Sequence, residues 1–151
     1  EVGTGCLVGL PDQTIESFAD DILFFKKINA DMIGIGPFLP HPQTPLKDCA
    51  HGDFTLALKV MALTRIMLPD INIPATTAME TLHPNGRIIA LQSGANVVMP
   101  NVTDMQYRKK YEIYPNKSRA LETPDKCKDD IAAKIHAIDR RISDSSGFRH
   151  K

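Results

Sequence analysis

Short apolar runs alternate with helical patterns along this chain, and that alternation limits the folds it can adopt. Each run has the length of a strand and carries Gly, Pro, Thr or Asn near its carboxyl end. The runs are TGCLVGL (4–10), MIGIGPFL (32–39), INIPATTAM (71–79) and ANVVMPN (95–101). Because alternating strands and helices favour parallel pairing with right-handed crossovers, the sequence predicts an α/β fold with about four parallel strands.

Helical patterns fill the intervals between these runs. The first helix is expected to begin at Thr14, whose hydroxyl can cap it. Its apolar stripe consists of Ile15, Phe18, Ile22 and Phe25, widened by Ala19, Leu23 and Ile28. The second helix should follow the cap Asp53 and stop by Pro69, and a short third helix is expected over 86–93.

The sequence beyond residue 101 is more polar and is expected to hold a loop and one last helix. Thr123 and Pro124 form a cap followed by proline at the first helical position. The apolar stripe that follows comprises Cys127, Ile131, Ile135, Ile138 and Ile142. These residues should pack on a core, whereas the polar tail over 143–151 should fray.

Two architectures fit this order of elements. Four parallel strands do not close a barrel, so the chain is either a small open α/β sheet or half of an eight-stranded β/α barrel. Such strands are apolar enough to expect cover on both faces. The spacing of the elements does not separate the two alternatives.

Composition excludes several classes of function. Lys and Arg together number 18, as do Asp and Glu, so a general affinity for nucleic acid or for a membrane surface is not predicted. The apolar runs are too short to span a bilayer, and the first residues do not resemble a signal peptide. The three cysteines form no C-x-x-C pair, which favours a reducing, cytoplasmic compartment. The start within a strand pattern, without methionine, suggests a fragment.

The carboxyl ends of the predicted strands are where a ligand is expected in either architecture. The residues there are small, apolar or hydroxylic, and they include the adjacent pair Thr76 and Thr77. They contain no nucleophile beside a base, no carboxylate pair and no metal cluster. The five histidines lack partners at metal-ligand spacing. A lining of this kind can hold a cofactor and an anionic group.

The first predicted strand carries the pattern of the fifth-strand motif of radical S-adenosylmethionine enzymes. The motif G-x-[IL]-x-G-x-x-[ED] is matched by Gly5, Leu7, Gly9 and Asp12. With DMIGIGPFLPHPQTPL, PATTAMETL, GANVVMPN and YEIYPNK, the chain resembles the biotin-synthase-like maturases of iron–iron hydrogenase. The resemblance covers residues 1–117, which would be the carboxyl-terminal half of the barrel. Residues 118–151 would then form a carboxyl-terminal helical segment and tail.

This resemblance implies a complete β/α barrel whose first half binds a 4Fe–4S cluster through C-x-x-x-C-x-x-C, a motif that this sequence lacks. It implies S-adenosylmethionine as co-substrate, cleaved to a 5′-deoxyadenosyl radical. The product would be the dithiomethylamine-bearing diiron part of the hydrogenase active site, made from a small-molecule or organometallic substrate. The implied partners are the missing amino-terminal half-barrel and other hydrogenase maturases. By itself this chain is expected to be inactive.

The resemblance also implies site residues. Leu7, Gly9, Pro37 and Met99 would bind S-adenosylmethionine. Thr76, Thr77, Tyr111 and Tyr114 would bind the substrate carboxylate. Because side chains alternate along a strand, both threonines reach one ligand only if the strand geometry breaks after Pro74. Otherwise Thr76 faces inward and Thr77 binds backbone or water.

One feature departs from the resemblance, and other functions stay open. Some family members hold a second cluster near the carboxyl terminus, but here only Cys127 is present, with Arg119 and Asp130 where partners would stand, so no such cluster is expected. A methylornithine-synthase-like or other biotin-synthase-like enzyme is the first alternative. A non-catalytic half-barrel that binds a small anion or a second chain is the other.

Overall fold

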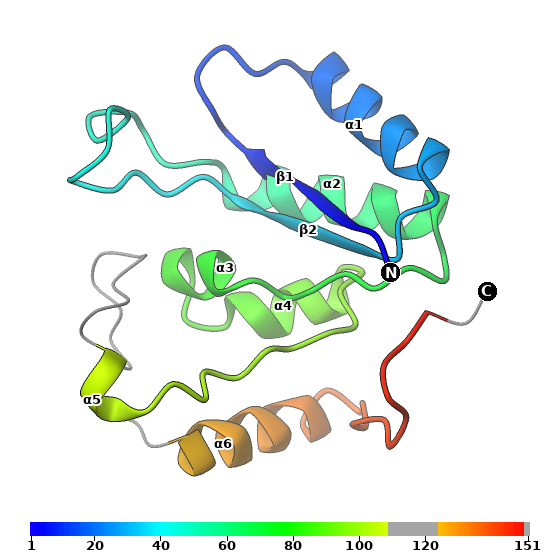
Figure 1. The fold of residues 1–151 in the computed structure, drawn as a ribbon, viewed down its shortest axis with the longest axis vertical. Coiled ribbons are helices and arrows are strands. Elements are labelled where there is room, and N and C mark those ends of the chain that lie inside the picture. The colour runs from blue at the N-terminus through cyan, green and yellow to red at the C-terminus, as the bar shows by residue number, and fades with distance from the viewer. Residues whose placement is uncertain (109–123, 150–151) are drawn as a thin grey trace.

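The computed structural model describes residues 1–108 and 124–149 (Figure 1). Within that part, two strands and six helices follow one another along the chain. The elements are β1 (Gly3–Val8), α1 (Ile15–Lys27), β2 (Met32–Pro37), α2 (Phe54–Met67), α3 (Thr77–Leu82), α4 (Gly86–Gln92), α5 (Met105–Arg108) and α6 (Pro124–His136). No helix among them is long and apolar enough to cross a membrane.

The sheet is parallel, as predicted, but only two of the four expected strands are regular. β1 pairs with β2 in a register that sets Gly5 opposite Gly34 and Leu7 opposite Gly36. The third and fourth apolar runs lie alongside as extended segments. Isolated parallel bridges join them at Met32–Asn72, Ile35–Ala75 and Pro74–Val97. Pro74 has no N–H for a ladder, and helix α3 begins three residues later, so neither segment forms a continuous strand.

Helices α1, α2, α4 and α6 begin where the sequence predicts them, whereas α3 lies within the run 71–79 that the sequence predicts to be a strand. Thr14 accepts a hydrogen bond from Ser17 N at the start of α1, and Asp53 accepts one from Leu56 N at the start of α2. α2 ends at Met67, two residues before Pro69. The apolar stripe of α1 is narrower than predicted. Phe18, Ile22 and Phe25 are buried, whereas Ile15 and Leu23 are exposed.

The core lies between the strands and the helices. One face of the sheet, which includes Val8, Ile33 and Ile35, packs in a single apolar cluster with residues of α1 and α2. Cys127, Ile131 and Ile135 of α6 join the same cluster, and Ile138 packs against it. Ile142 is exposed, contrary to the predicted stripe, because α6 ends at His136. On the other face of β1, Gly3, Gly5 and Leu7 are exposed.

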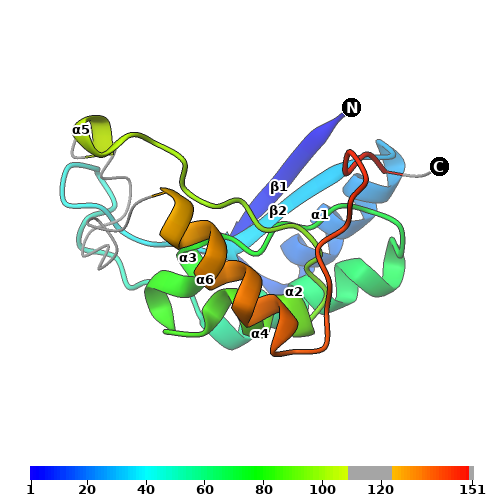
Figure 2. The ribbon, with the colours of Figure 1, turned by 90° about the horizontal axis from the view of Figure 1, so that it is seen from below.

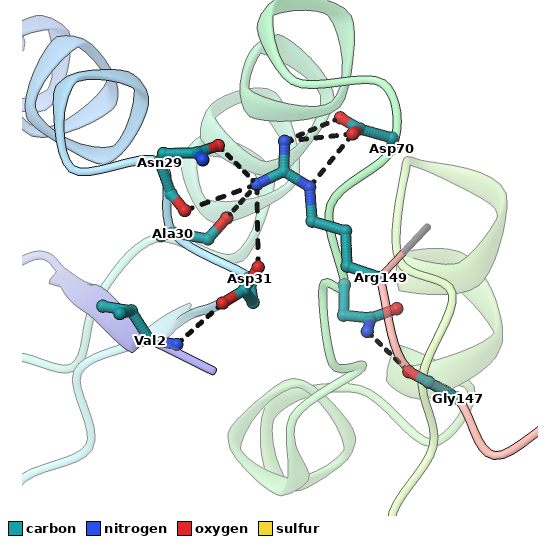
Figure 3. Close-up of polar contacts among 8 residues, drawn as sticks. Val2, Asn29, Ala30, Asp31, Asp70, Gly147 and Arg149 are labelled. Atoms are coloured by element: carbon teal, nitrogen blue, oxygen red, sulfur yellow. Dashed lines mark hydrogen bonds and ion pairs between the residues drawn. The ribbon is translucent and has the colours of Figure 1, made fainter. Parts of the chain in front are cut away.

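Contrary to the prediction that the polar tail frays, it makes specific contacts with the rest of the chain up to residue 149. Figure 2 shows it returning from α6 toward the end of the sheet where the strands begin. There the Arg149 side chain is 8% exposed and donates paired hydrogen bonds to Asp70, of 3.0 and 3.1 Å (Figure 3). It also donates to Asn29 Oδ1 at 2.9 Å and Ala30 O at 2.6 Å. Arg149 therefore joins the turns before two neighbouring parallel segments.

A second contact continues this junction into the first strand. Asp31 lies 4.0 Å from Arg149 Nη1 and accepts a 2.8 Å hydrogen bond from Val2 N (Figure 3). Gly147 O accepts from Asn72 Nδ2 at 2.8 Å. The last described residues thus hold together the amino ends of the parallel segments.

The Arg149–Asp70 contact predicts a defined pH dependence. Hydrogen bonding from Arg149 lowers the pKa of Asp70 below its ordinary value. A lowered folded-state pKa means that the stabilisation is complete above the unfolded pKa and is lost as pH falls through the folded pKa. Asp70→Asn should therefore lower the melting temperature at neutral pH, and this difference should shrink below about pH 4. Thermal unfolding from pH 3 to pH 7 measures it, and a difference that does not change with pH would contradict the assignment.

Candidate functional site

The carboxyl ends of the four parallel segments bring several predicted residues to one face. Leu7 is paired with Gly36 in the register of β1 and β2. The Ile35–Ala75 bridge, extended by one residue in each segment, puts Thr76 beside Gly36. The Pro74–Val97 bridge, extended by two residues, puts Met99 beside Thr76. Paired residues of a parallel sheet point to the same side. The four residues therefore form a row on the face opposite the helix-packed core.

Direct packing supports the centre of this row. A methyl group at Gly36 would lie 2.8 Å from Thr76 Oγ1, so the absence of a side chain at Gly36 makes room for the threonine hydroxyl. Thr76 stands at the position before α3 where a threonine commonly caps the helix, yet its side chain makes no capping bond. Its Oγ1 is buried without a hydrogen-bond partner among the described residues. Such an orphaned hydroxyl fits a site that a ligand completes.

The ends of the row are apolar and open. Leu7 is 49% exposed and Met99 is 58% exposed. Large apolar side chains with this exposure, at the ends of parallel strands, suit contact with a flat apolar group such as a purine base. Both residues belong to the predicted S-adenosylmethionine wall. Their role in binding remains a prediction.

Gly9 lies in a tight loop just after β1. Its φ of 95° is in the region that favours glycine, and a side chain there would overlap Gly52 Cα. Gln13 holds this loop, since its Oε1 accepts from Gly9 N at 2.8 Å and its Nε2 donates to Leu7 O at 2.8 Å. The glycine motif therefore fixes the backbone next to Leu7. Sequence reasoning missed Gln13, which follows the acidic residue that ends the motif.

Pro37 is placed differently from the other predicted S-adenosylmethionine residues. In the register of the two strands it pairs with Val8, which is fully buried in the helix-packed core. Pro37 is itself fully buried. Its ring therefore belongs to the face opposite Leu7, and it supports the site from behind. Direct contact with a ligand remains a prediction for this residue.

Thr77 does not share the environment of Thr76. The geometry changes from extended to helical between them, because Thr76 is extended and Thr77 is the first residue of α3. Thr77 Oγ1 accepts a hydrogen bond of 2.9 Å from Arg87 Nη2. Arg87 belongs to α4 and its Nε lies 3.3 Å from Glu80 Oε2. The other two predicted substrate residues, Tyr111 and Tyr114, lie outside the described residues.

Sequence reasoning missed Arg87 entirely. The signal was present as the single charged residue of the mostly apolar helix GRIIALQ. Arg87 is only 8% exposed. Charged side chains are rarely buried unless they are paired, so a lone arginine in an apolar helix indicates a specific partner.

A 4Fe–4S cluster does not fit the described residues. They contain no group of three or more His, Cys, Asp or Glu side chains that could hold a metal ion. Burial, and to a smaller extent the charge of Asp21, raises the pKa of Cys6 to about 12, so this thiol is not a ready thiolate ligand. Cys127 is buried in the core cluster, and Asp130 pairs with Lys134 at 3.0 Å. Any cluster would need ligands from outside this part of the chain.

An apolar groove also lies on the helix side of the molecule. It has a volume of about 490 Å³ and runs between α1 and α2, where Ile15, Leu23 and Leu63 are among its lining residues. Its lining carries one charged residue, Lys59, and no hydroxyl or carboxylate. The groove is separate from the row at the strand ends, so it is not the candidate site.

Parallel segments covered by helices on one face define an α/β protein of the barrel or open-sheet class. No family model matches the chain. The chain is 51% identical over 151 residues to the [FeFe] hydrogenase maturase subunit HydE of Thermotoga maritima, which covers all of this chain and 43% of the relative. This finding confirms the resemblance inferred from the strand-end motifs.

More distant similarity extends to another enzyme. The 3-methylornithine synthase of Methanosarcina acetivorans is 30% identical over 122 residues, which is 81% of this chain and 33% of the relative. A crystal structure of methylornithine synthase (PylB) superposes with a TM-score of 0.68 and 24% identity, covering 94% of this chain and 40% of that structure. The chain therefore shares the fold of a part of that enzyme. It spans less than half the length of these relatives.

Proposed function

We propose that this chain forms the carboxyl-terminal half of a radical S-adenosylmethionine β/α barrel that acts in assembly of the [FeFe]-hydrogenase active site. The observation that carries the proposal is the 51% identity to HydE along the whole chain. The strand-end row supports it, because it combines open apolar ends with one buried hydroxyl that has no partner in the described residues. In this proposal the four parallel segments correspond to strands five to eight of the barrel.

The residues at the strand ends contact different parts of the ligands in this proposal. Leu7 and Met99 contact the adenine of S-adenosylmethionine, and the loop at Gly9 lets backbone approach the nucleoside. Thr76 donates its hydroxyl hydrogen to a carboxylate of the substrate. When bound and reductively cleaved, S-adenosylmethionine supplies a 5′-deoxyadenosyl radical.

The proposal includes the partners of the complete protein. β1 is an edge strand whose outer side is unpaired in the described part of the chain, and its Leu7 face is exposed. An amino-terminal half-barrel would cover that edge and contribute the 4Fe–4S ligands. Other hydrogenase maturases would receive the product. The free cysteines are compatible with a cytoplasmic location.

A chimera tests the function. In the chimera, residues 1–151 of this chain replace the matching segment of Thermotoga HydE, so that the relative supplies the rest of the barrel. Because the identity is 51%, we expect the two parts to pack together. We expect the chimera to bind a 4Fe–4S cluster, cleave S-adenosylmethionine and support hydrogenase maturation with the other maturases. The isolated chain, reconstituted with iron and sulfide, should do none of these.

The alternative function is tested by the same chimera. Methylornithine synthase is the second candidate, because similarity to it covers 81% of this chain. A folded, cluster-loaded chimera that fails to mature hydrogenase would contradict the first proposal. Formation of methylornithine, followed by mass spectrometry, would favour the second candidate.

A further inference from the structure

Arg87 is a buried cation with two partners at the carboxyl end of the parallel segments. It is 8% exposed and reaches from α4 to α3, where Nη2 donates to Thr77 Oγ1 at 2.9 Å and Nε lies 3.3 Å from Glu80 Oε2. Glu80 balances the charge, so Arg87 adds little net positive charge to the site. Its specific contribution is the hydrogen bond to Thr77.

The backbone leaves Arg87 little freedom to adjust. Gly86, the first residue of α4, lies so close to α3 that a side chain there would overlap Met79 O. Gly86 N also donates to His83 O at 2.8 Å in the turn between the helices. The backbones of α3 and α4 are thus in direct contact at the residue before Arg87. Arg87 therefore holds Thr77 at a set place.

Thr77 in turn fixes the residue before it. The chain changes from extended to helical geometry between Thr76 and Thr77, so the position of Thr77 decides where the Thr76 side chain points. Thr76 Oγ1 lies over Gly36 without a partner among the described residues. The Thr77 hydroxyl oxygen accepts a hydrogen bond from the Arg87 guanidinium, so the hydroxyl hydrogen stays available for donation. Accepting a hydrogen bond from a cation polarises the hydroxyl and makes it a stronger donor.

We propose that Arg87 is a positioning residue for a carboxylate subsite formed by Thr76 and Thr77. It holds the Thr77 oxygen from the α4 side, so that the turn into α3 keeps Thr76 Oγ1 over Gly36 and the hydrogens of both hydroxyls are free for a ligand. This inference rests on the proposed function for the presence of a carboxylate ligand. It adds a residue that acts through the threonines and does not touch the ligand.

The test measures binding of a carboxylate and of S-adenosylmethionine separately in the chimera. Arg87→Met is combined with Glu80→Gln, so that the methionine keeps the packing of the stem and no carboxylate is left unpaired. Titration calorimetry with acetate and with succinate should show affinity about tenfold to a hundredfold weaker, the range for one lost hydrogen bond to a charged group. The dissociation constant for S-adenosylmethionine should change less than about twofold on the same scale. Arg87→Lys, which keeps one donor for Thr77, should recover part of the loss.

Arg65→Met is the matched control. Arg65 is another partly buried arginine, and it holds Gly94 O at 2.8 Å and Asn96 Oδ1 at 2.9 Å, at the amino end of the fourth segment. Its loss should lower the melting temperature without changing the affinity for acetate or succinate. If Arg65→Met lowers the melting temperature and the carboxylate affinity as much as the Arg87 variant does, Arg87 has only a structural role and the inference is overturned. Unchanged affinity in the Arg87 variant would also overturn it.

The outcomes separate this inference from the function on which it rests. If the unmodified chimera matures hydrogenase but binds neither acetate nor succinate, the positioning role is overturned and the proposed function stands. If the chimera is inactive in maturation while the Arg87 variant loses carboxylate affinity as expected, the subsite is supported and the proposed function fails.

Discussion

Replacing Thr76 and Thr77 together by valine is expected to weaken binding of a carboxylate ligand to the chimera by about two orders of magnitude or more. Valine keeps the volume and the branched shape of threonine but removes the hydroxyl. Each lost hydrogen bond to a charged group costs roughly 1.5–3 kcal/mol, and each 1.4 kcal/mol is a tenfold change in affinity. Affinity for S-adenosylmethionine should barely change, because its wall is assigned to Leu7, Gly9 and Met99.

The single variants divide this loss between the two threonines. Thr76→Val should affect only ligand binding, because Thr76 Oγ1 has no partner among the described residues and its removal leaves none of their polar groups without a hydrogen bond. Thr77→Val also deprives the buried Arg87 of its acceptor, so it should lower the melting temperature as well as the affinity. Tyr111→Phe and Tyr114→Phe should give smaller losses of carboxylate affinity.

Titration of acetate, succinate and S-adenosylmethionine against each variant decides the outcome. Equal loss of affinity for carboxylate and for S-adenosylmethionine would mean that the strand end had been disrupted. No loss of either affinity would mean that the threonine pair has only a structural role.

Gly52→Ala should have the largest effect on stability. The added methyl group would overlap Val8 O and lie 2.8 Å from Phe38 N, and both are backbone atoms that cannot rotate away. These same atoms share a 2.8 Å hydrogen bond, and Gly52 N donates to Phe38 O at 2.8 Å. Overpacking at such a site, with loss of these bonds, should lower the free energy of unfolding by about 3 kcal/mol.

Gly34→Ala provides the control for this change. A methyl group at Gly34 would meet only Thr4 O, at 3.9 Å, so it should be nearly neutral. Because Gly52 also packs against Gly9, Gly52→Ala should displace the loop beside Leu7 and weaken S-adenosylmethionine binding in any variant that still folds. Thermal unfolding of both variants of the chimera checks the prediction. Equal melting temperatures for Gly52→Ala and the parent would refute it.

Much of the fold could be predicted because its signals are local. Thr14 and Asp53 cap the helices that follow them, and Pro69 comes just after α2 ends. Period and capping depend on residues within a turn or two, which a sequence displays directly. The parallel order of segments follows from the same alternation, since helical crossovers between strands favour one arrangement.

The regularity of the strands could not be predicted in the same way. Residues 71–79 read as one strand, but only 71–75 run beside β2 before α3 begins at Thr77. A short apolar run is equally compatible with either state, and the packing of α3 against α4 is a tertiary effect. This break ends the alternation that would have put Thr76 and Thr77 on opposite faces, and it leaves Thr77 in contact with Arg87 of α4.

The sequence by itself determined the alternation of parallel segments and crossover helices, the end of the sheet where a ligand is expected, and the resemblance to hydrogenase maturases carried by its strand-end motifs. Only the tertiary structure decided which side chains share an environment there. It placed Thr76 over Gly36 and Pro37 on the core face of the sheet, and it paired Thr77 with Arg87 through a hydrogen bond. It also anchored Arg149 on Asp70, a residue 79 positions earlier. Such contacts depend on how separate elements pack, and the burial and charge pairing that select them exist only once the chain has folded.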